Sequence, residues 1–150
     1  MLTAEQIMTT DVRSVTRDTS LEDLAKVFEQ TRFDSLPVID DEGKLEGVVS
    51  QNDLIERDKP LHIPTVISIF DWVLYLESEK SFEKDVKRMA AMTVGEIMKE
   101  PRATCGPQTP VGDIAALMSD KQAHLVPVTD EDSKVLGVVA RLDMIRAMEK

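Results

Sequence analysis

The sequence predicts an α+β fold built from two similar units, each of the order β-α-β-β-α, packed against each other. Three observations favour this fold. Residues 3–55 align with residues 93–145 at a constant offset of 90 positions without a gap, and fifteen of the 53 pairs are identical. Each copy has one amphipathic helical pattern followed by two short apolar strand patterns. Each copy alone is near the lower size limit of a stable domain, so each half should bury its apolar face against the other.

The duplication divides the 150-residue chain into three predicted parts. Residues 1–58 form the first repeat, residues 59–92 an inter-repeat segment, and residues 93–150 the second repeat. The segment carries four of the six aromatic residues and ends in a predicted amphipathic helix, so its composition is too apolar for a flexible linker. Two interpretations stay open: the segment covers an edge of the core, or it forms a subunit interface.

In the first repeat, Thr19 with Glu22 resembles a capping box at the start of a helix that ends before Phe33. Four apolar residues at helical spacing form its predicted core-facing stripe, namely Leu21, Leu24, Ala25 and Phe28. The other predicted elements are a helical turn, an extended piece, two strands and a short helix, at residues 3–8, 12–16, 36–39, 45–50 and about 52–57.

The second repeat follows the same path. Thr109 is the predicted cap of its helix, with Pro110 at the first helical position. The corresponding stripe is Val111, Ile114, Ala115 and Met118. The strands are expected at residues 126–129 and 135–140, and the last helix at 142–148.

Composition argues against several classes of protein. The net charge of -10 repels nucleic acid and anionic lipid. The single cysteine, Cys105, excludes an internal disulfide and is expected to be a small buried apolar residue. The first five residues have no signal-peptide pattern, and the most apolar stretch, residues 63–76, is too short to span a bilayer. We therefore expect a soluble, cytoplasmic protein with no nucleic-acid or membrane partner.

In each repeat a strand containing Gly-Val-Val leads into a helix with an aspartate in its first turn. In the first repeat, Ser50 and Asp53 gather at the helix N-terminus, where free N–H groups favour an anion. A hydroxyl and a carboxylate can also hold the two vicinal hydroxyls of a ribose, and Gly47 would leave room for a flat ring against the sheet. The competing interpretation is a helix cap, because Ser-x-x-Asp is close to a capping box. The two roles are compatible.

These features resemble a tandem pair of CBS domains, which are named after cystathionine β-synthase and together form a Bateman module. The resemblance rests on the duplicated unit, on Leu-Pro-Val-Ile-Asp at 36–40, on Gly-Val-Val-Ser-x-x-Asp at 47–53 and on Ile-Met near the start of each repeat. It implies pseudo-two-fold symmetry and two clefts between the repeats that bind adenosine nucleotides or related ligands. It also implies a homodimer, and we expect the effector protein to be a separate, unidentified chain.

The resemblance further implies residue roles. In the family, the hydroxyl residue and the aspartate of the motif hold the ribose, which points to Ser50 and Asp53 and, in the second repeat, to Asp143. The residue three before the proline faces the phosphates, which is Asp34 in one repeat and His124 in the other. The base is expected in the same pocket as Ser50 and Asp53, near Val12, Arg13, Phe33 and Leu36.

The second repeat departs from this pattern because Ala140 stands where the hydroxyl should be. We therefore expect one good site, centred on Ser50 and Asp53. His124 and Arg141 are candidate phosphate ligands. The alternatives are a partly buried neutral histidine and a solvated surface arginine.

The sequence contains no set of residues that indicates catalysis. It lacks a Cys-x-x-Cys pair, a phosphate-binding glycine loop and a His-Glu-x-x-His motif, and its two histidines lie in unrelated contexts. No metal or cofactor is expected. The favoured function is a regulatory module that senses AMP, ADP or ATP and signals to a partner by a population shift. The alternatives are an S-adenosylmethionine sensor, whose sulfonium would suit Asp34, and a ligand-free dimerisation or adaptor module.

Overall fold

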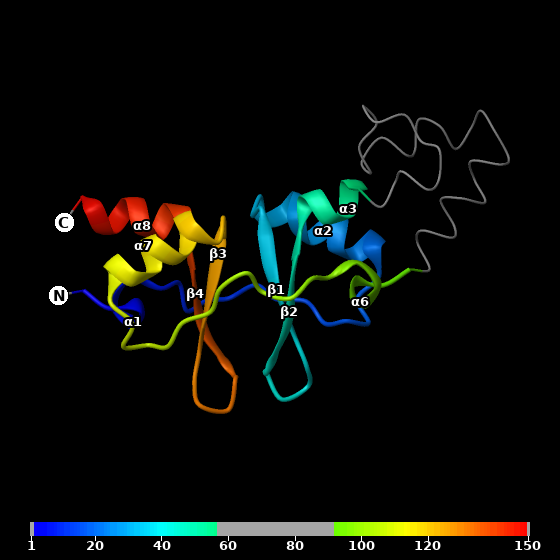
Figure 1. Cartoon of the computed structure of the whole chain (residues 1–150). Coiled ribbons are helices and arrows are strands. Elements are labelled where there is room, and N and C mark those ends of the chain that lie inside the picture. The colour runs from blue at the N-terminus through cyan, green and yellow to red at the C-terminus, as the bar shows by residue number, and fades with distance from the viewer. Residues whose placement is uncertain (1, 57–91, 150) are drawn as a thin grey trace, which may run out of the picture.

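The computed structural model describes residues 2–56 and 92–149. Two β-hairpins lie side by side with their turns pointing the same way, and the longer helices gather at the opposite end (Figure 1). The first repeat contains α1 (Ala4–Ile7), α2 (Leu21–Thr31), β1 (Ser35–Ile39), β2 (Leu45–Ser50) and α3 (Gln51–Glu56). The second contains α6 (Val94–Ile97), α7 (Val111–Asp120), β3 (Leu125–Thr129), β4 (Val135–Ala140) and α8 (Arg141–Met148).

The predicted α+β fold of two packed repeats is confirmed, with one change in each. The extended piece expected at residues 12–16 is no continuous strand. Val15 makes a single parallel bridge to Val38, and Cys105 makes the equivalent bridge to Val128. The regular sheet of each repeat is therefore the antiparallel hairpin alone, β1 with β2 and β3 with β4.

Contacts between the repeats come in pairs that are related by the 90-residue offset. The Leu45 amide donates to the Ser133 carbonyl over 2.9 Å, and the Val135 amide donates to the Gly43 carbonyl over 3.0 Å. These two bonds join the hairpins near their turns. Because each bond is the symmetry mate of the other, the repeats are related by the expected pseudo-two-fold axis.

The short first helix of each repeat packs on the other repeat. Figure 1 shows α1 beside the second repeat and α6 beside the first. Ala4 of α1 is fully buried in the second repeat's core, and Val94 and Ile97 of α6 are buried in the first repeat's core. Each core is thus completed by the opposite repeat, which is the mutual burial predicted from the small size of each half.

The two helix caps differ from the prediction by one residue. Ser20 caps α2, and its hydroxyl accepts from the Asp23 amide over 3.1 Å. Pro110 occupies the cap position of α7. The expected caps, Thr19 and Thr109, instead close the preceding turns, since their hydroxyls accept from the amides of Thr16 and Gly106.

The core-facing stripe is confirmed for α2, where all four residues are buried. The stripe of α7 is not fully buried. Ile114 is completely covered, but Ala115 is exposed and Met118 is half-buried, because both line an open pocket between the repeats. Cys105 is buried as predicted, and burial raises the pKa of its thiol.

The predicted inter-repeat segment and its amphipathic helix, residues 59–92, lie outside the described residues except for Met92, which packs against the first repeat's core. The boundaries at 58 and 93 stay a prediction. Within the described part of the chain, no helix is both long enough and apolar enough to cross a membrane.

Candidate functional site

Two pockets lie between the repeats, and we call them pocket A and pocket B. Pocket A is the smaller, with a volume of about 240 Å³. Pocket B is a wider groove of about 1180 Å³. Each pocket takes residues from both repeats, so the packing of the two halves creates both sites.

Pocket A joins the start of the first repeat to the motif of the second. The segment after α1 supplies Val12 and Arg13, and the loop before β1 supplies Phe33. The β4–α8 junction supplies Ala140, Arg141 and Asp143 from across the repeat boundary. Further lining residues are Thr9, Asp11, Arg32, Asp34, Ser35, Leu36, Pro37, His124, Leu125, Val138, Leu142 and Arg146.

Pocket B joins the motif of the first repeat to the start of the second. The β2–α3 junction of the first repeat supplies Ser50 and Asp53, and the segment after α6 supplies Lys99 and Arg102. The rest of the lining comes mainly from α7, α8 and the loop before β3. It includes Ala115, Met118, Gln122, Ala123, His124, Arg141, Met144, Ile145 and Met148.

Asp143 is the buried acidic group of pocket A and is 7% exposed. Its Oδ2 accepts from the Ala140 amide over 2.8 Å, which caps α8, and its Oδ1 accepts from the Thr9 hydroxyl over 3.0 Å. Its Oδ1 also lies 3.9 Å from the Arg146 guanidinium. A carboxylate offers about four lone-pair sites, so it has acceptor capacity beyond its two hydrogen bonds. Asp143 can therefore both cap its helix and receive the hydroxyls of a ligand.

Asp53 holds the equivalent place in pocket B and is 8% exposed. Its Oδ2 accepts from the Ser50 amide over 2.8 Å, and its own amide donates to the Ser50 hydroxyl over 3.1 Å. Its Oδ1 lies 3.0 Å from the Lys99 ammonium. The interpretation of this motif as a helix cap is therefore confirmed, while its role in ligand binding stays a prediction.

The predicted grouping of residues within one pocket is wrong. Ser50 and Asp53 line pocket B, whereas Val12, Arg13, Phe33 and Leu36 line pocket A with Asp143. The exchange of the segments after α1 and α6 accounts for Val12 and Arg13, and the packing of the two repeats brings Phe33 and Leu36 to the same pocket. Thr9 pairs with Val138 on β4, and Lys99 pairs with Val48 on β2, so each segment runs along the other repeat's sheet.

The space beside Gly47 was expected to admit a flat ring, and this expectation is also wrong. A Cβ at Gly47 would lie 2.8 Å from the Lys99 carbonyl oxygen. At Gly137 it would lie 2.8 Å from the Thr9 carbonyl oxygen and 2.7 Å from the Met8 sulfur. The glycines are required because the exchanged segments pass directly over the strands.

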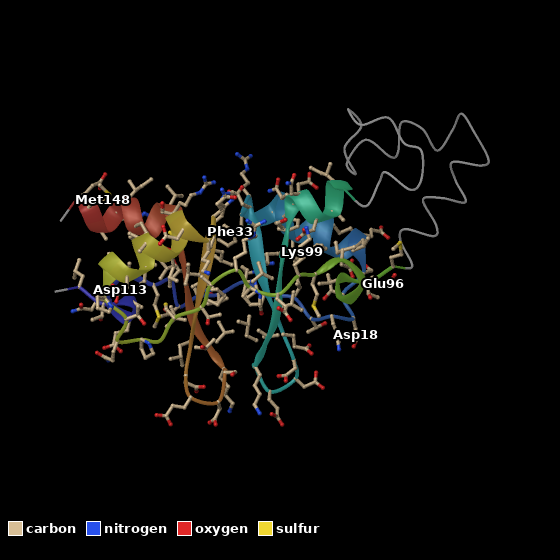
Figure 2. All side chains as sticks on the ribbon, in the orientation of Figure 1. Asp18, Phe33, Glu96, Lys99, Asp113 and Met148 are labelled. Carbon is tan, nitrogen blue, oxygen red and sulfur yellow. The ribbon has the colours of Figure 1, made fainter. Side chains whose placement is uncertain are left out.

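The apolar parts of the pockets differ most at one repeat-related position. Phe33 lines pocket A and is 46% exposed, and Figure 2 shows it between the two repeats, near the ends of β1 and β3. The equivalent residue in the second repeat is Ala123, which is 4% exposed. No aromatic side chain occurs among the described residues that line pocket B. Leu36 is 1% exposed and belongs to the core beneath the pocket.

Four arginines line pocket A, namely Arg13, Arg32, Arg141 and Arg146. Arg141 and His124 line both pockets, and both side chains are exposed. Arg141 forms a 3.0 Å ion pair with Asp34 from the first repeat. An exposed guanidinium beside a pocket can bind a phosphate through two parallel hydrogen bonds, which makes pocket A suitable for an anionic ligand.

Sequence reasoning missed Thr9 and Lys99, which contact the two aspartates from the opposite repeat. It also missed Arg32 and Arg146. The available signal was the position directly after Ile-Met in each repeat, where Thr9 aligns with Lys99. Among the described residues, no cluster of three or more His, Cys, Asp or Glu side chains could hold a metal ion.

Comparison with known proteins places this architecture in a family. The family model of the CBS domain matches residues 4–59 and residues 94–150. The chloroplastic CBS domain-containing protein CBSX2 of Arabidopsis thaliana is 30% identical over 138 residues, which cover 86% of this chain and 55% of that protein. An uncharacterized protein of Methanocaldococcus jannaschii is 26% identical over 141 residues, covering 89% of this chain and 84% of its own length.

A solved structure agrees in fold. The crystal structure of CBSX2 in complex with AMP superposes with a TM-score of 0.76 at 26% identity and covers 99% of this chain and 97% of that chain. The match of two family segments, the duplicated hairpin units and the pockets between them lead to one conclusion. The chain belongs to the CBS domain family and carries a tandem pair of CBS domains.

Proposed function

We propose that this protein is a regulatory binding module for adenosine-containing nucleotides and that pocket A is its principal site. One observation carries the proposal: pocket A combines a buried carboxylate, an exposed aromatic ring and exposed guanidinium groups. These groups match the ribose, the base and the phosphates of a nucleotide, in that order. Pocket B, with Ser50 and Asp53, is proposed as a weaker second site.

Each part of the nucleotide has a partner of suitable chemistry. The free lone pairs of Asp143 can accept from the ribose hydroxyls. Phe33 offers a face on which a base can stack, with Val12 beside it. Arg13, His124 and Arg141 also line the pocket, and we propose that these basic side chains bind the phosphates. The complex of CBSX2 with AMP supports this choice of ligand, because CBSX2 is a relative with the same fold.

A thermal-shift screen of the purified protein against AMP, ADP, ATP, S-adenosylmethionine and GTP tests the proposal. A ligand at one hundred times its dissociation constant adds about 2.7 kcal/mol of stability, which such a screen resolves. We expect a shift with at least one adenosine ligand and none with GTP. No shift with any adenosine ligand would favour the alternative, a ligand-free interaction module.

Two matched variants assign the site. Asp143→Asn keeps the size of the side chain and an oxygen that can cap α8, but it removes the charge that favours the ribose hydroxyls. We expect Asp143→Asn to lower the affinity for the adenosine ligand about tenfold or more in calorimetric titration. We expect Asp53→Asn to leave the affinity of the tighter binding event unchanged. The opposite ranking would make pocket B the principal site.

Signalling would follow from the position of the pockets. A ligand that contacts both repeats favours the arrangement of repeats that it fits best, and it shifts the population towards that arrangement. A separate effector protein would recognise this change. This makes the protein a binding module rather than an enzyme.

We also propose that the protein is a cytoplasmic homodimer. Leu142, Ile145 and Met148 of α8 are 61%, 52% and 83% exposed, and Ile55 of α3 is 46% exposed. Ile55, Ile145 and Met148 also line pocket B, and exposed apolar residues gathered in this way mark interaction surfaces. Light scattering coupled to size exclusion tests the dimer. We expect Ile145→Glu to give a monomer that keeps the far-UV spectrum of the parent protein, and a monomeric parent would disprove the dimer.

A further inference from the structure

Arg141 and Asp34 form an ion pair at the place where the two pockets meet. The Arg141 Nη2 lies 3.0 Å from the Asp34 Oδ2, and the two residues are 107 positions apart in the chain. Both residues line pocket A and both line pocket B. The pair therefore links the repeats at the mouth of each pocket.

The repeat symmetry does not reproduce this pair. The residues 90 positions away are His124 and Gln51. The Gln51 side-chain amide donates instead to the Phe33 carbonyl over 2.8 Å. The link between Asp34 and Arg141 is thus a feature of one side of the molecule and is no consequence of the duplicated fold.

The pair is weak enough for a ligand to open it. Its side chains are 59% and 61% exposed, and a single short contact joins them. Exposed pairs of this kind contribute little because water and salt screen them. A phosphate presents several acceptor oxygens and can engage the guanidinium through two hydrogen bonds, so it competes well with one carboxylate oxygen.

Asp34 acts on such a ligand in two ways. It holds the guanidinium that a phosphate would use, and its own charge repels a phosphate at the same place. A neutral adenosine has no group that needs Arg141 and is not affected by the competition. Asp34 therefore discriminates between ligands by their charge.

We propose that Asp34 is a specificity-determining residue. It keeps Arg141 paired in the unliganded protein, so a phosphate-bearing ligand binds only by taking Arg141 from Asp34 and separating this link between the repeats. The inference rests on the proposed nucleotide function of pocket A. Beyond that function, the inference identifies the residue that sets the preference for phosphate and the contact that changes when a nucleotide binds.

Calorimetric titration with adenosine, AMP, ADP and ATP tests this inference. In Asp34→Asn we expect the affinity for the three phosphorylated ligands to rise about three- to tenfold relative to that for adenosine. The matched control is Asp11→Asn, which removes the same charge from the lining of the same pocket. We expect Asp11→Asn to change the affinity for the phosphorylated ligands, relative to that for adenosine, by no more than about twofold.

A second background identifies Arg141 as the group through which Asp34 acts. Arg141→Gln gives this position the residue that the first repeat carries at Gln51. In that background Asp34→Asn should raise the ratio of AMP to adenosine affinity clearly less than it does in the parent protein, because only the direct repulsion between Asp34 and the phosphate remains to be relieved. Both residues are exposed, and thermal melts of each variant check that the fold is retained.

The outcomes separate the inference from the proposed function. An equal gain in Asp11→Asn, or a gain of the same size in the Arg141→Gln background, would overturn the inference and would indicate a general effect of net charge. An unchanged ratio in Asp34→Asn, with adenosine and AMP both bound, would overturn the inference alone. Failure of all four ligands to bind the parent protein and every variant would overturn both.

Discussion

Pocket A and pocket B are built from the same duplicated parts, yet each has what the other lacks. Pocket A has the aromatic Phe33 but carries Ala140 where the motif of the other repeat has a serine. Pocket B has Ser50 beside Asp53 but carries the small, buried Ala123 where a ring would stack. The two repeats have diverged, and the exchange of segments has combined the stronger half of each site with the weaker half of the other.

The carboxylates show the same contrast. Asp143 accepts from the neutral hydroxyl of Thr9, whereas Asp53 faces the ammonium of Lys99. Asp143 also lies 3.9 Å from the exposed Arg146 guanidinium. The much shorter contact of Asp53 with an ammonium neutralises more of its charge, so more of the Asp143 charge stays available to a ligand. The position after Ile-Met in one repeat thus adjusts the acidic group of the other, which is why we assign the tighter site to pocket A.

The largest expected effect comes from the glycines beneath the exchanged segments. Gly137→Ala would place a Cβ 2.8 Å from the Thr9 carbonyl oxygen and 2.7 Å from the Met8 sulfur, so the segment over β4 must move. We expect a loss of about 2–3 kcal/mol in the free energy of unfolding, measured in urea. Gly47→Ala is the matched variant and should cost less, because Met98 stands further away than Met8 does. A larger loss at Gly47 would contradict this ranking.

The aromatic difference between the pockets gives the next effect. Phe33→Ala removes a half-exposed ring from the lining of pocket A, so the fold should keep its stability. Base stacking on an aromatic side chain contributes about 1–3 kcal/mol, so the AMP affinity should fall about tenfold in calorimetric titration. Phe33→Tyr should restore it. A loss of less than about twofold would show that the base does not stack on this ring.

The smallest effect concerns the serine that one motif retains and the other has lost. Ser50→Ala removes a hydroxyl that accepts from the Asp53 amide, and it should destabilise the protein by about 1 kcal/mol in urea unfolding. Ala140→Ser adds the equivalent hydroxyl at the N-terminus of α8 and should stabilise the protein by a similar amount. If Ala140→Ser does not raise the free energy of unfolding, the N-termini of α8 and α3 are not equivalent, although the alignment at 90 positions predicts that they are.

Much of the fold followed from local patterns in the sequence. The gapless alignment at 90 positions predicted two equal units, and the short apolar runs around Pro37 and Pro127 predicted their strands. The stripe of α2 predicted its buried face. These predictions are confirmed by the structure. They succeeded because helical and strand patterns depend only on neighbouring residues within one element. The one-residue error at Thr19 and Thr109 arose because a threonine can cap a helix or close a turn, and sequence alone does not rank the two.

The composition of each site was decided by tertiary structure. The sequence by itself determined that Asp53 and Asp143 would stand at equivalent helix N-termini, since the strand, the turn and the aspartate are consecutive. It did not determine that Phe33 would share a pocket with Asp143 rather than with Asp53. That depends on how the two repeats pack, with α1 and α6 each crossing to the other repeat, where Ala4 and Val94 complete the opposite core. Such an exchange is driven by the burial of apolar surface between segments that are distant in the sequence. The repeat pattern in the sequence is the same with or without the exchange, so the pattern could not reveal it.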